Sequence, residues 1–168
     1  MDAVVTQAGD LFLDSGATFS KCRVYPYDLW RLWNRSERYL MVIGLNPSTA
    51  DEVKNDQTVR KCIKFARHWG YGGLHMTNIF AFRATDPKRM KSHTSPIGDH
   101  NDLWLAKLAA GAGMILAAWG IHGDHLTRGA DVRRMIGVKL PMLCLGTTKP
   151  GQPRHPLYMQ DSTIPVRF

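Results

Sequence analysis

The sequence predicts an α/β domain whose sheet is mainly parallel and covered by helices on both faces. Short apolar segments at 40–43, 74–82, 113–119 and 141–145 have the length and composition of buried strands. Longer segments between them carry apolar residues at helical spacing. Because parallel strands need a crossover that is usually a helix, this alternation predicts a central sheet of four strands.

The N-terminal part contains an aromatic segment and then the first of these strands. Residues 19–35 are rich in aromatic side chains with some alternation, and Pro26 interrupts them, which favours an edge strand or hairpin. The strand at 40–43 stops at a glycine and a polar turn follows. In that turn Ser48 or Thr49 is placed to cap the N-terminus of a helix.

The remaining elements follow in order. Residues from about 55 to 69 have apolar positions at helical spacing, and glycines end this helix. A turn at 84–87 follows the second strand. Further helices are predicted at 99–110 and 124–136, and the last strand leads into a loop at 146–158.

Length and composition indicate one globular domain, residues 1–168, that is long enough to bury a core. Hydrophobic residues make up 44% and charged residues 21% of the chain. No apolar run approaches the roughly 20 residues of a membrane span, and the N-terminus lacks a basic-then-apolar signal. We therefore expect a cytoplasmic protein that makes no contact with a membrane.

Cysteine and histidine spacing gives no metal motif. Cys22, Cys62 and Cys144 are odd in number and far apart, which argues against a disulfide framework, a zinc site or an iron–sulfur cluster. We expect them to be buried thiols. His122 and His125 have a spacing too common to predict a metal. The sequence therefore predicts neither a metal nor a cofactor.

The charge balance favours a polyanionic partner. The chain has 22 Lys and Arg against 14 Asp and Glu, a formal net charge of +8. Such an excess permits binding to nucleic acid through phosphate neutralisation, although basic groups on helices are often only solvated.

Polar residues follow several strand ends. Asn46, Asn78, the Trp119-Gly120 pair and His155 each come after an apolar segment. Since the carboxyl ends of parallel strands share one edge of a sheet, these residues are expected to converge on one cleft. A helix N-terminus at the same edge would attract anions.

These residues also resemble a known enzyme superfamily. Residues 44–48 resemble the first motif of the uracil-DNA glycosylases, nearest to the mismatch-directed thymine/uracil branch, which has Asn where the uracil-specific branch has Asp. Asn78 is similar to the strand-end Asn that reads the pyrimidine edge. Residues 115–120 resemble the apolar strand that ends in Trp-Gly, and residues 154–156 resemble the His-Pro motif. The order and spacing agree over residues 39–158.

The whole chain resembles still more closely a family of uncharacterised bacterial and phage proteins distantly related to those glycosylases. That nearer resemblance carries no established activity. The superfamily resemblance implies a three-layer α/β/α sandwich around a core at residues 39–158, with residues 19–35 as an N-terminal addition. It also implies DNA glycosylase-like hydrolase chemistry in DNA repair or modification.

The chemistry of N-glycosidic cleavage assigns candidate roles. His155 could donate a hydrogen bond to a base oxygen, and Asn78 could both donate to and accept from a pyrimidine edge. Asn46 could orient water but cannot accept its proton. Asp51 or Asp56 could be the general base, or could only favour the helix N-terminus electrostatically.

Further ligand contacts are expected around these residues. The candidates are Gly44, Leu45, Pro47, Ser48, Asn78, Phe80, Arg83, Trp119, Lys149 and Arg154. Lys149 and Arg154 would contact phosphate. Structural alternatives stay open: Asn78 could satisfy backbone groups, His155 could belong to a surface loop and Trp119 could belong to the core. The base-stacking aromatic could be Phe80, Tyr25 or Trp69.

The predicted function is processing of a nucleic-acid or nucleotide base at its N-glycosidic bond. The loop at 149–154 lacks an apolar wedge for a duplex, which favours a single strand (DNA rather than RNA), a free nucleotide or a modified base. Two alternatives are a non-catalytic module that binds a nucleotide or single-stranded nucleic acid, and a phage-type transferase that modifies DNA bases.

Overall fold

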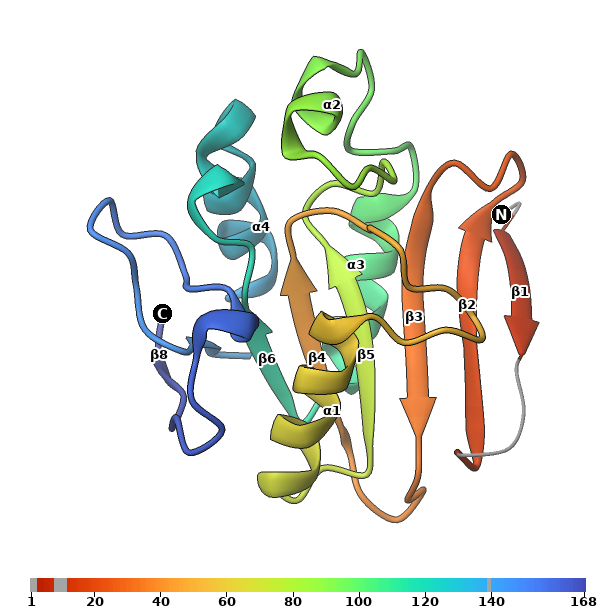
Figure 1. Ribbon diagram of the computed structural model, residues 1–168, viewed down its shortest axis with the longest axis vertical. Helices are drawn as coiled ribbons and strands as arrows, with labels where there is room; N and C mark the ends of the chain where they lie inside the picture. The colour runs from red at the N-terminus through yellow and green to blue at the C-terminus, as the bar shows by residue number, and fades with distance from the viewer. Residues whose placement is uncertain (1–2, 8–11, 139) are drawn as a thin grey trace.

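The computed structural model describes residues 3–7, 12–138 and 140–168. The parts of the predicted domain at residues 1–2, 8–11 and 139 lie outside the described residues. One eight-stranded sheet has the order β1-β2-β3-β5-β4-β6-β7-β8 (Figure 1). Its strands are β1 (Ala3–Gln7), β2 (Asp14–Ser20), β3 (Pro26–Leu32), β4 (Tyr39–Gly44), β5 (Gly73–Asn78), β6 (Met114–Ala117), β7 (Met142–Cys144) and β8 (Val166–Arg167).

The prediction of a mainly parallel sheet of four strands is wrong. The four predicted strands are the parallel neighbours β5, β4, β6 and β7. However, β3 pairs antiparallel with β5, β2 and β1 continue the sheet beyond it, and β8 pairs antiparallel with β7. The fold is still α/β, but its sheet is mixed, and the glycosylase-like architecture that the resemblance implied is not supported.

The aromatic segment at 19–35 accounts for much of this difference. Pro26 does not interrupt a strand: it is the first residue of β3, a position that tolerates the missing N–H. Leu29 and Trp30 point to opposite faces of the sheet, yet both are buried. Since both faces are covered, β3 lies inside the sheet between β2 and β5, not at an edge.

Helices cover both faces of the sheet (Figure 1). α1 packs over β4 and β5 on one face, while α3 and α4 pack together on the other. The helical segments are α1 (Gln57–His68), α2 (Pro87–Ser92), α3 (Asn101–Gly111), the 3₁₀ segment η1 (Ile121–Thr127), α4 (Arg128–Ile136) and the 3₁₀ segment η2 (Pro156–Tyr158).

The prediction that Ser48 or Thr49 caps a helix is also wrong. α1 begins at Gln57, and its N-cap is Asp56, whose carboxylate accepts a hydrogen bond from the backbone N–H of Val59 at 2.9 Å. The residues between β4 and Asp56 are therefore a long loop, and this loop lies over the face of the sheet that α1 covers.

The second predicted strand, 74–82, ends earlier than expected. As β5 it stops at Asn78. The backbone N–H groups of Ile79 and Phe80 then donate to the carbonyls of Gly44, the last residue of β4, and of Leu45, each at 2.9 Å. The predicted turn at 84–87 leads into α2, which begins at Pro87. Backbone hydrogen bonds thus join the segment that follows β5 to the end of β4 and the first residue after it.

A buried arginine holds the long loop in place. Arg31 is 1% exposed, and its guanidinium donates to the backbone carbonyl of Asp51 at 2.8 Å and to Asn55 Oδ1 at 2.9 Å. It also donates to the carbonyls of Trp30 and Gly16. Because a guanidinium has five N–H donors in a fixed plane, one side chain joins two strands to the loop.

The thiols divide into two groups. Cys62 and Cys144 are buried, as expected, but Cys22 is exposed, so that part of the prediction is wrong. Cys22 lies in the tight turn between β2 and β3.

Within the parts of the chain that the structure describes, none of the helices has both the length and the apolar character needed to cross a bilayer.

Candidate active site

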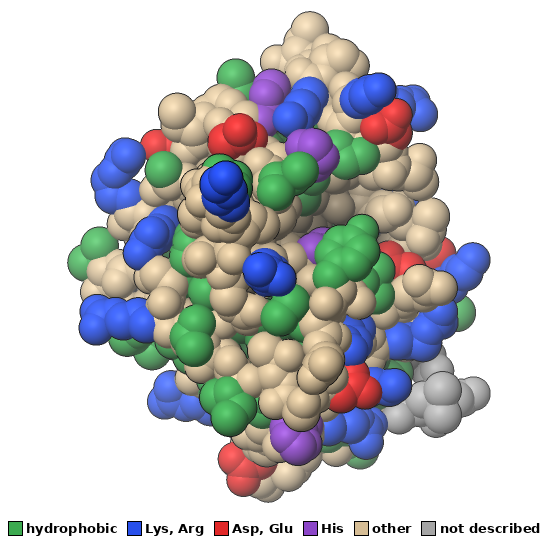
Figure 2. Space-filling view, turned by 60° about the vertical axis from the view of Figure 1, so that its left-hand side comes forward, with side chains coloured by type: hydrophobic (Ala, Val, Ile, Leu, Met, Phe, Trp, Pro, Cys, Tyr) green, Lys and Arg blue, Asp and Glu red, His purple; other side chains and the backbone are tan. Residues whose placement is uncertain are grey.

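A cavity of about 990 Å³ opens at the carboxyl ends of β4, β5 and β6. Its floor is the face of the sheet that α1 covers, and its walls come from the loops after these strands, the start of α1 and the chain leading into η2. In Figure 2 the surface is hollowed near its centre, with histidine and hydrophobic side chains at the border of the hollow and basic side chains around it. The volume is typical of a site for a small ligand.

Nearly all of the predicted site residues line this one cavity. They are Gly44, Leu45, Asn46, Pro47, Ser48, Asp51, Asp56, Asn78, Arg83, Trp119, Lys149, Arg154 and His155. The exception is Phe80, which is 0% exposed and packs in the core below α3 and α4. The backbone bonds that follow β5 turn its ring away from the cavity. Tyr25 and Trp69 do not line the cavity either.

Asn46 joins two walls of the cavity. Its Nδ2 donates to the backbone carbonyl of Ala84 at 2.7 Å and to that of Pro47 at 3.1 Å. The backbone N–H of Ala84 in turn donates to the Pro47 carbonyl at 3.0 Å. Asn46 therefore uses its N–H groups to fix the loop after β4, and only its Oδ1 has no hydrogen-bond partner among the described residues.

Asn78 presents an unbonded amide at the end of β5. Its backbone carbonyl accepts a hydrogen bond from Asn101 Nδ2 at 2.9 Å, which fixes the backbone. Within the described residues its side chain has no such partner, and its Oδ1 lies directly against Gly44. The amide can therefore offer one donor and one acceptor to a ligand.

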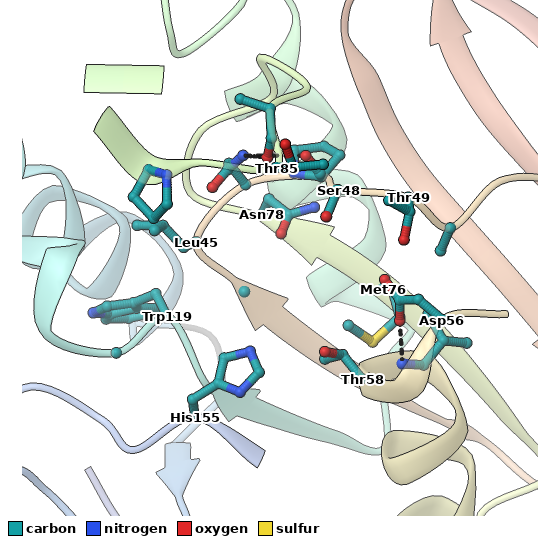
Figure 3. Close-up of a pocket in the computed structure, with 18 of the residues that line it drawn as sticks. Leu45, Ser48, Thr49, Asp56, Thr58, Met76, Asn78, Thr85, Trp119 and His155 are labelled. Atoms are coloured by element: carbon teal, nitrogen blue, oxygen red, sulfur yellow. Dashed lines mark hydrogen bonds between the residues drawn. The ribbon is translucent and has the colours of Figure 1, made fainter. Parts of the chain in front are cut away.

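His155 is held as a neutral hydrogen-bond donor. Its Nδ1 accepts a hydrogen bond from the backbone N–H of Leu157 at 3.4 Å, so the neutral ring carries its hydrogen on Nε2. Burial lowers the pKa of His155 below its usual 6.5, against the opposing influence of the Asp56 carboxylate. In Figure 3 the His155 ring and the Asn78 amide point toward the same open space.

Three carboxylates line the cavity. Asp28 is hydrogen-bonded to His75 Nδ1 at 2.9 Å, while Asp56 and Asp51 differ from each other in their bonding. The Oδ1 atom of Asp56 caps α1, and its second oxygen has no partner among the described residues. Figure 3 places Asp56 beside Thr58, across the open space from His155. Asp51 instead closes a turn, with Oδ1 accepting from the N–H groups of Val53 and Lys54. Because α1 starts later, Asp51 does not lie in a helix N-terminus.

The pKa of Asp51 reflects this local bonding. Burial alone would raise it, but the backbone N–H groups of Lys54 and Val53 and the nearby Arg83 and Arg31 together lower it. A carboxylate stabilised in this way is a weak base. Asp56, whose second oxygen has no hydrogen-bond partner among the described residues, is better placed than Asp51 to accept a proton.

Trp119 and Tyr158 are the aromatic residues at the His155 end. Trp119 is 2% exposed, and its Nε1 donates to Gln152 Oε1 at 2.9 Å, so its ring is a fixed wall. Tyr158 is 85% exposed, and its ring centroid lies 5.8 Å from that of His155. Sequence reasoning missed Tyr158, although its place three residues after His155 in the final loop was an available signal.

Sequence reasoning also missed several threonines and the apolar floor of the cavity. Thr49, Thr58 and Thr85 line its walls, and Phe19, Leu29 and Met76 line its floor. In the described residues, no group of three or more His, Cys, Asp or Glu side chains is arranged to hold a metal ion. The site as described therefore offers amide, imidazole, hydroxyl and carboxylate groups.

Comparisons with known proteins identify a family whose function is unknown. Residues 27–157 match the family model described as "Protein of unknown function (DUF1643)". The comparison with curated proteins found no match, and neither did the comparison with solved structures. The matched range includes most of the cavity-lining residues, from Asp28 to His155.

Proposed function

Because the chain belongs to the DUF1643 family of proteins of unknown function, we propose an activity from its site: cleavage of the N-glycosidic bond of a pyrimidine-like or modified base. One observation carries this proposal. The Asn78 amide, His155 Nε2 and the second Asp56 oxygen line the same cavity, and none of the three has a hydrogen-bond partner among the described residues. The motif resemblance to uracil-DNA glycosylases points to the same chemistry.

The reaction would use these three groups in distinct roles. Asp56 accepts a proton from water as the water oxygen attacks the anomeric carbon of the sugar. The bond between that carbon and the base nitrogen breaks, and its electron pair leaves with the base. His155 Nε2–H and the Asn78 N–H groups then stabilise the negative charge on the base oxygens. Asn46 fixes the wall, and its Oδ1 can orient the water.

The basic residues at the mouth support a nucleic-acid or nucleotide ligand. Lys149 and Arg154 line the cavity and are exposed, which suits contacts with phosphate. Single-stranded DNA remains the partner that we propose first. A cytoplasmic location, inferred from the sequence, is part of the same proposal.

A non-catalytic binding module is the second candidate. One observation favours it: within the described part of the chain, the one hydrogen bond of the Asp56 carboxylate caps α1, a structural role that requires no catalysis. Such a module would use the same amide and imidazole to hold a base without cleaving it. Transfer of a group to a DNA base is a third possibility for the same cavity.

Base release from oligonucleotides tests these alternatives. The substrates are single strands and duplexes that contain uracil, a thymine mismatch or a modified pyrimidine. In Asp56→Asn the new amide can still cap α1, so the protein should stay folded while release falls by about 100-fold or more. His155→Gln should also reduce release, whereas Asp51→Asn is the matched control and should keep most of it.

Other outcomes would redirect the proposal. Salt-dependent binding without release, unaffected by Asp56→Asn, would support the binding module. A change in the mass of the oligonucleotide without an abasic site would support group transfer. Release that is equally fast in Asp56→Asn and in the wild-type protein would refute the catalytic roles given above.

A further inference from the structure

The cavity is longer than a single pyrimidine requires. Its floor begins at Phe19 on β2 and its far wall is Trp119, which follows β6. The sheet order β2-β3-β5-β4-β6 makes this four steps between neighbouring strands, or about 19 Å. Asn78 and His155 serve the end near β6, so the arm over β2 and β3 has space for another part of the ligand.

Arg83 is the cation in the wall of that arm. It lines the cavity, and its guanidinium carbon lies 5.4 Å from the centroid of the Phe19 ring. Nη2 donates to the backbone carbonyl of Ala50 at 3.3 Å. Nε is buried without a partner, and Nη1 has no hydrogen bond among the described residues. One hydrogen bond therefore serves a group with five N–H donors.

The buried arginines Arg31 and Arg128 differ in this respect from Arg83, which is half-buried. Arg31 makes hydrogen bonds to two strands and to the long loop. Arg128 donates to the carbonyl of Ile79 at 2.8 Å and pairs with Asp102. Both side chains are thereby explained as structural. In Arg83 the buried Nε lacks an acceptor, which is costly unless a ligand supplies one.

The charges around Arg83 leave room for one anion. Asp51 and Glu52 interact with Arg83 and with Arg31, and Arg23 forms an ion pair with Glu52 at 2.9 Å. Because Arg23 already pairs with Glu52, Arg83 and Arg31 are left to share the Asp51 carboxylate. Asp28, which also lines this arm, is hydrogen-bonded to His75. Burial lowers the pKa of Arg83, as it does that of Arg31.

Two hydroxyl groups add donors to this arm. Ser48 and Thr49 line the cavity, and neither side chain has a hydrogen-bond partner among the described residues. Figure 3 places them on the opposite side of the cavity from Trp119 and His155. Hydroxyl donors beside a guanidinium are the groups that commonly hold phosphate or carboxylate oxygens.

We infer that Arg83, with Ser48 and Thr49, forms an anion subsite that holds an acidic group at the end of the ligand remote from His155. The group is a phosphate or a carboxylate. It belongs either to a nucleotide, as its own phosphate, or to a modified base, as an acidic substituent. This inference rests on the proposed function in one respect, because it takes the cavity to be the ligand site.

Thermal unfolding with simple anions tests the subsite without any catalysis. At constant ionic strength, inorganic phosphate or acetate should raise the melting temperature of the wild-type protein. The rise should disappear in Arg83→Gln and persist in part in Arg83→Lys. Arg23→Gln is the matched control, since Arg23 also lies over Phe19, 4.2 Å from the centroid, but does not line the cavity.

Calorimetric binding of three ligands then identifies the source of the anion. They are deoxyuridine, deoxyuridine monophosphate and 5-carboxymethyl-deoxyuridine. At least one charged ligand should bind more tightly than deoxyuridine, with an advantage of about tenfold that Arg83→Gln removes. In Arg23→Gln that advantage should change by about threefold or less. The charged ligand with the larger gain in affinity over deoxyuridine shows whether the anion is a nucleotide phosphate or an acidic substituent of the base.

The outcomes separate this inference from the proposed activity. If anions raise the melting temperature in a way that depends on Arg83, but the protein releases no base, the anion subsite is supported and the cleavage chemistry is refuted. Anion effects that are absent, or that are equal in the wild-type protein and Arg83→Gln, would overturn the subsite even if base release is observed.

Discussion

Gly44 and Asn78 are in such close contact that a Cβ at position 44 would lie 2.8 Å from Asn78 Oδ1. They are register partners on the parallel strands β4 and β5. The glycine therefore gives the Asn78 amide its place at the floor of the cavity. Any side chain at position 44 would push that amide aside.

Gly44→Ala is expected to affect function far more than folding. The clash is with the end of a side chain that can rotate, so the free energy of unfolding should fall by about 1 kcal/mol or less. Ligand binding and base release should decrease as much as in Asn78→Ala. Urea unfolding and release assays measure the two effects. If Gly44→Ala and Asn78→Ala reduce function additively when combined, the contact is not the cause.

The neutral state of His155 predicts a pH dependence of stability. Its pKa is lowered in the folded protein by burial, so the unfolded chain binds more protons as the pH falls through 6.5. The stability linked to His155 is therefore complete above pH 6.5 and is lost below it. Urea unfolding between pH 5 and 8 should give a smaller decrease at low pH for His155→Gln than for the wild-type protein.

A direct titration checks the same group. The NMR signal of the His155 ring should titrate below the usual imidazole pKa of 6.5. The result that would contradict this account is a His155 titration at or above 6.5.

Loss of Arg31 should destabilise the protein and open the cavity. Arg31→Met removes the donors for the carbonyls of Asp51, Trp30 and Gly16 and for Asn55 Oδ1. The expected loss is about 3 kcal/mol in the free energy of unfolding, because buried acceptors are left unsatisfied. Hydrogen exchange should rise in the loop between β4 and α1. Unchanged exchange there would show that other contacts hold the loop.

The three thiols should react at very different rates. Cys22 is exposed, and a hydrogen bond with the Ser20 hydroxyl and backbone bonds lower its pKa. Burial raises the pKa of Cys62 to about 12, and burial also raises that of Cys144. A thiol reagent should therefore modify one cysteine rapidly in the native protein. Cys22→Ser should abolish this fast phase, and a fast phase that remains would place another thiol at the surface.

Local sequence patterns determined part of this protein. The apolar runs identified the parallel strands β4 to β7, and their polar ends identified residues that line one cavity. These features depend on side-chain periodicity and on turn residues, and both can be recognised from residues that are close together in the sequence. The same reasoning placed the start of the first helix too early. Ser48 and Asp56 are both residue types that cap helices, but only Asp56, at the end of the long loop, does so here.

The tertiary structure alone decided the rest. The insertion of β3 beside β5 depends on a partner about 45 residues away, and no local period encodes that pairing. Asn46 holds a wall of the cavity because the Ala84 carbonyl reaches it, and Phe80 is buried because the chain turns after β5. Arg31 and Arg83 look alike in the sequence, but packing gives one a full set of acceptors and the other a single bond. Long-range hydrogen bonding, which no short segment specifies, made that difference.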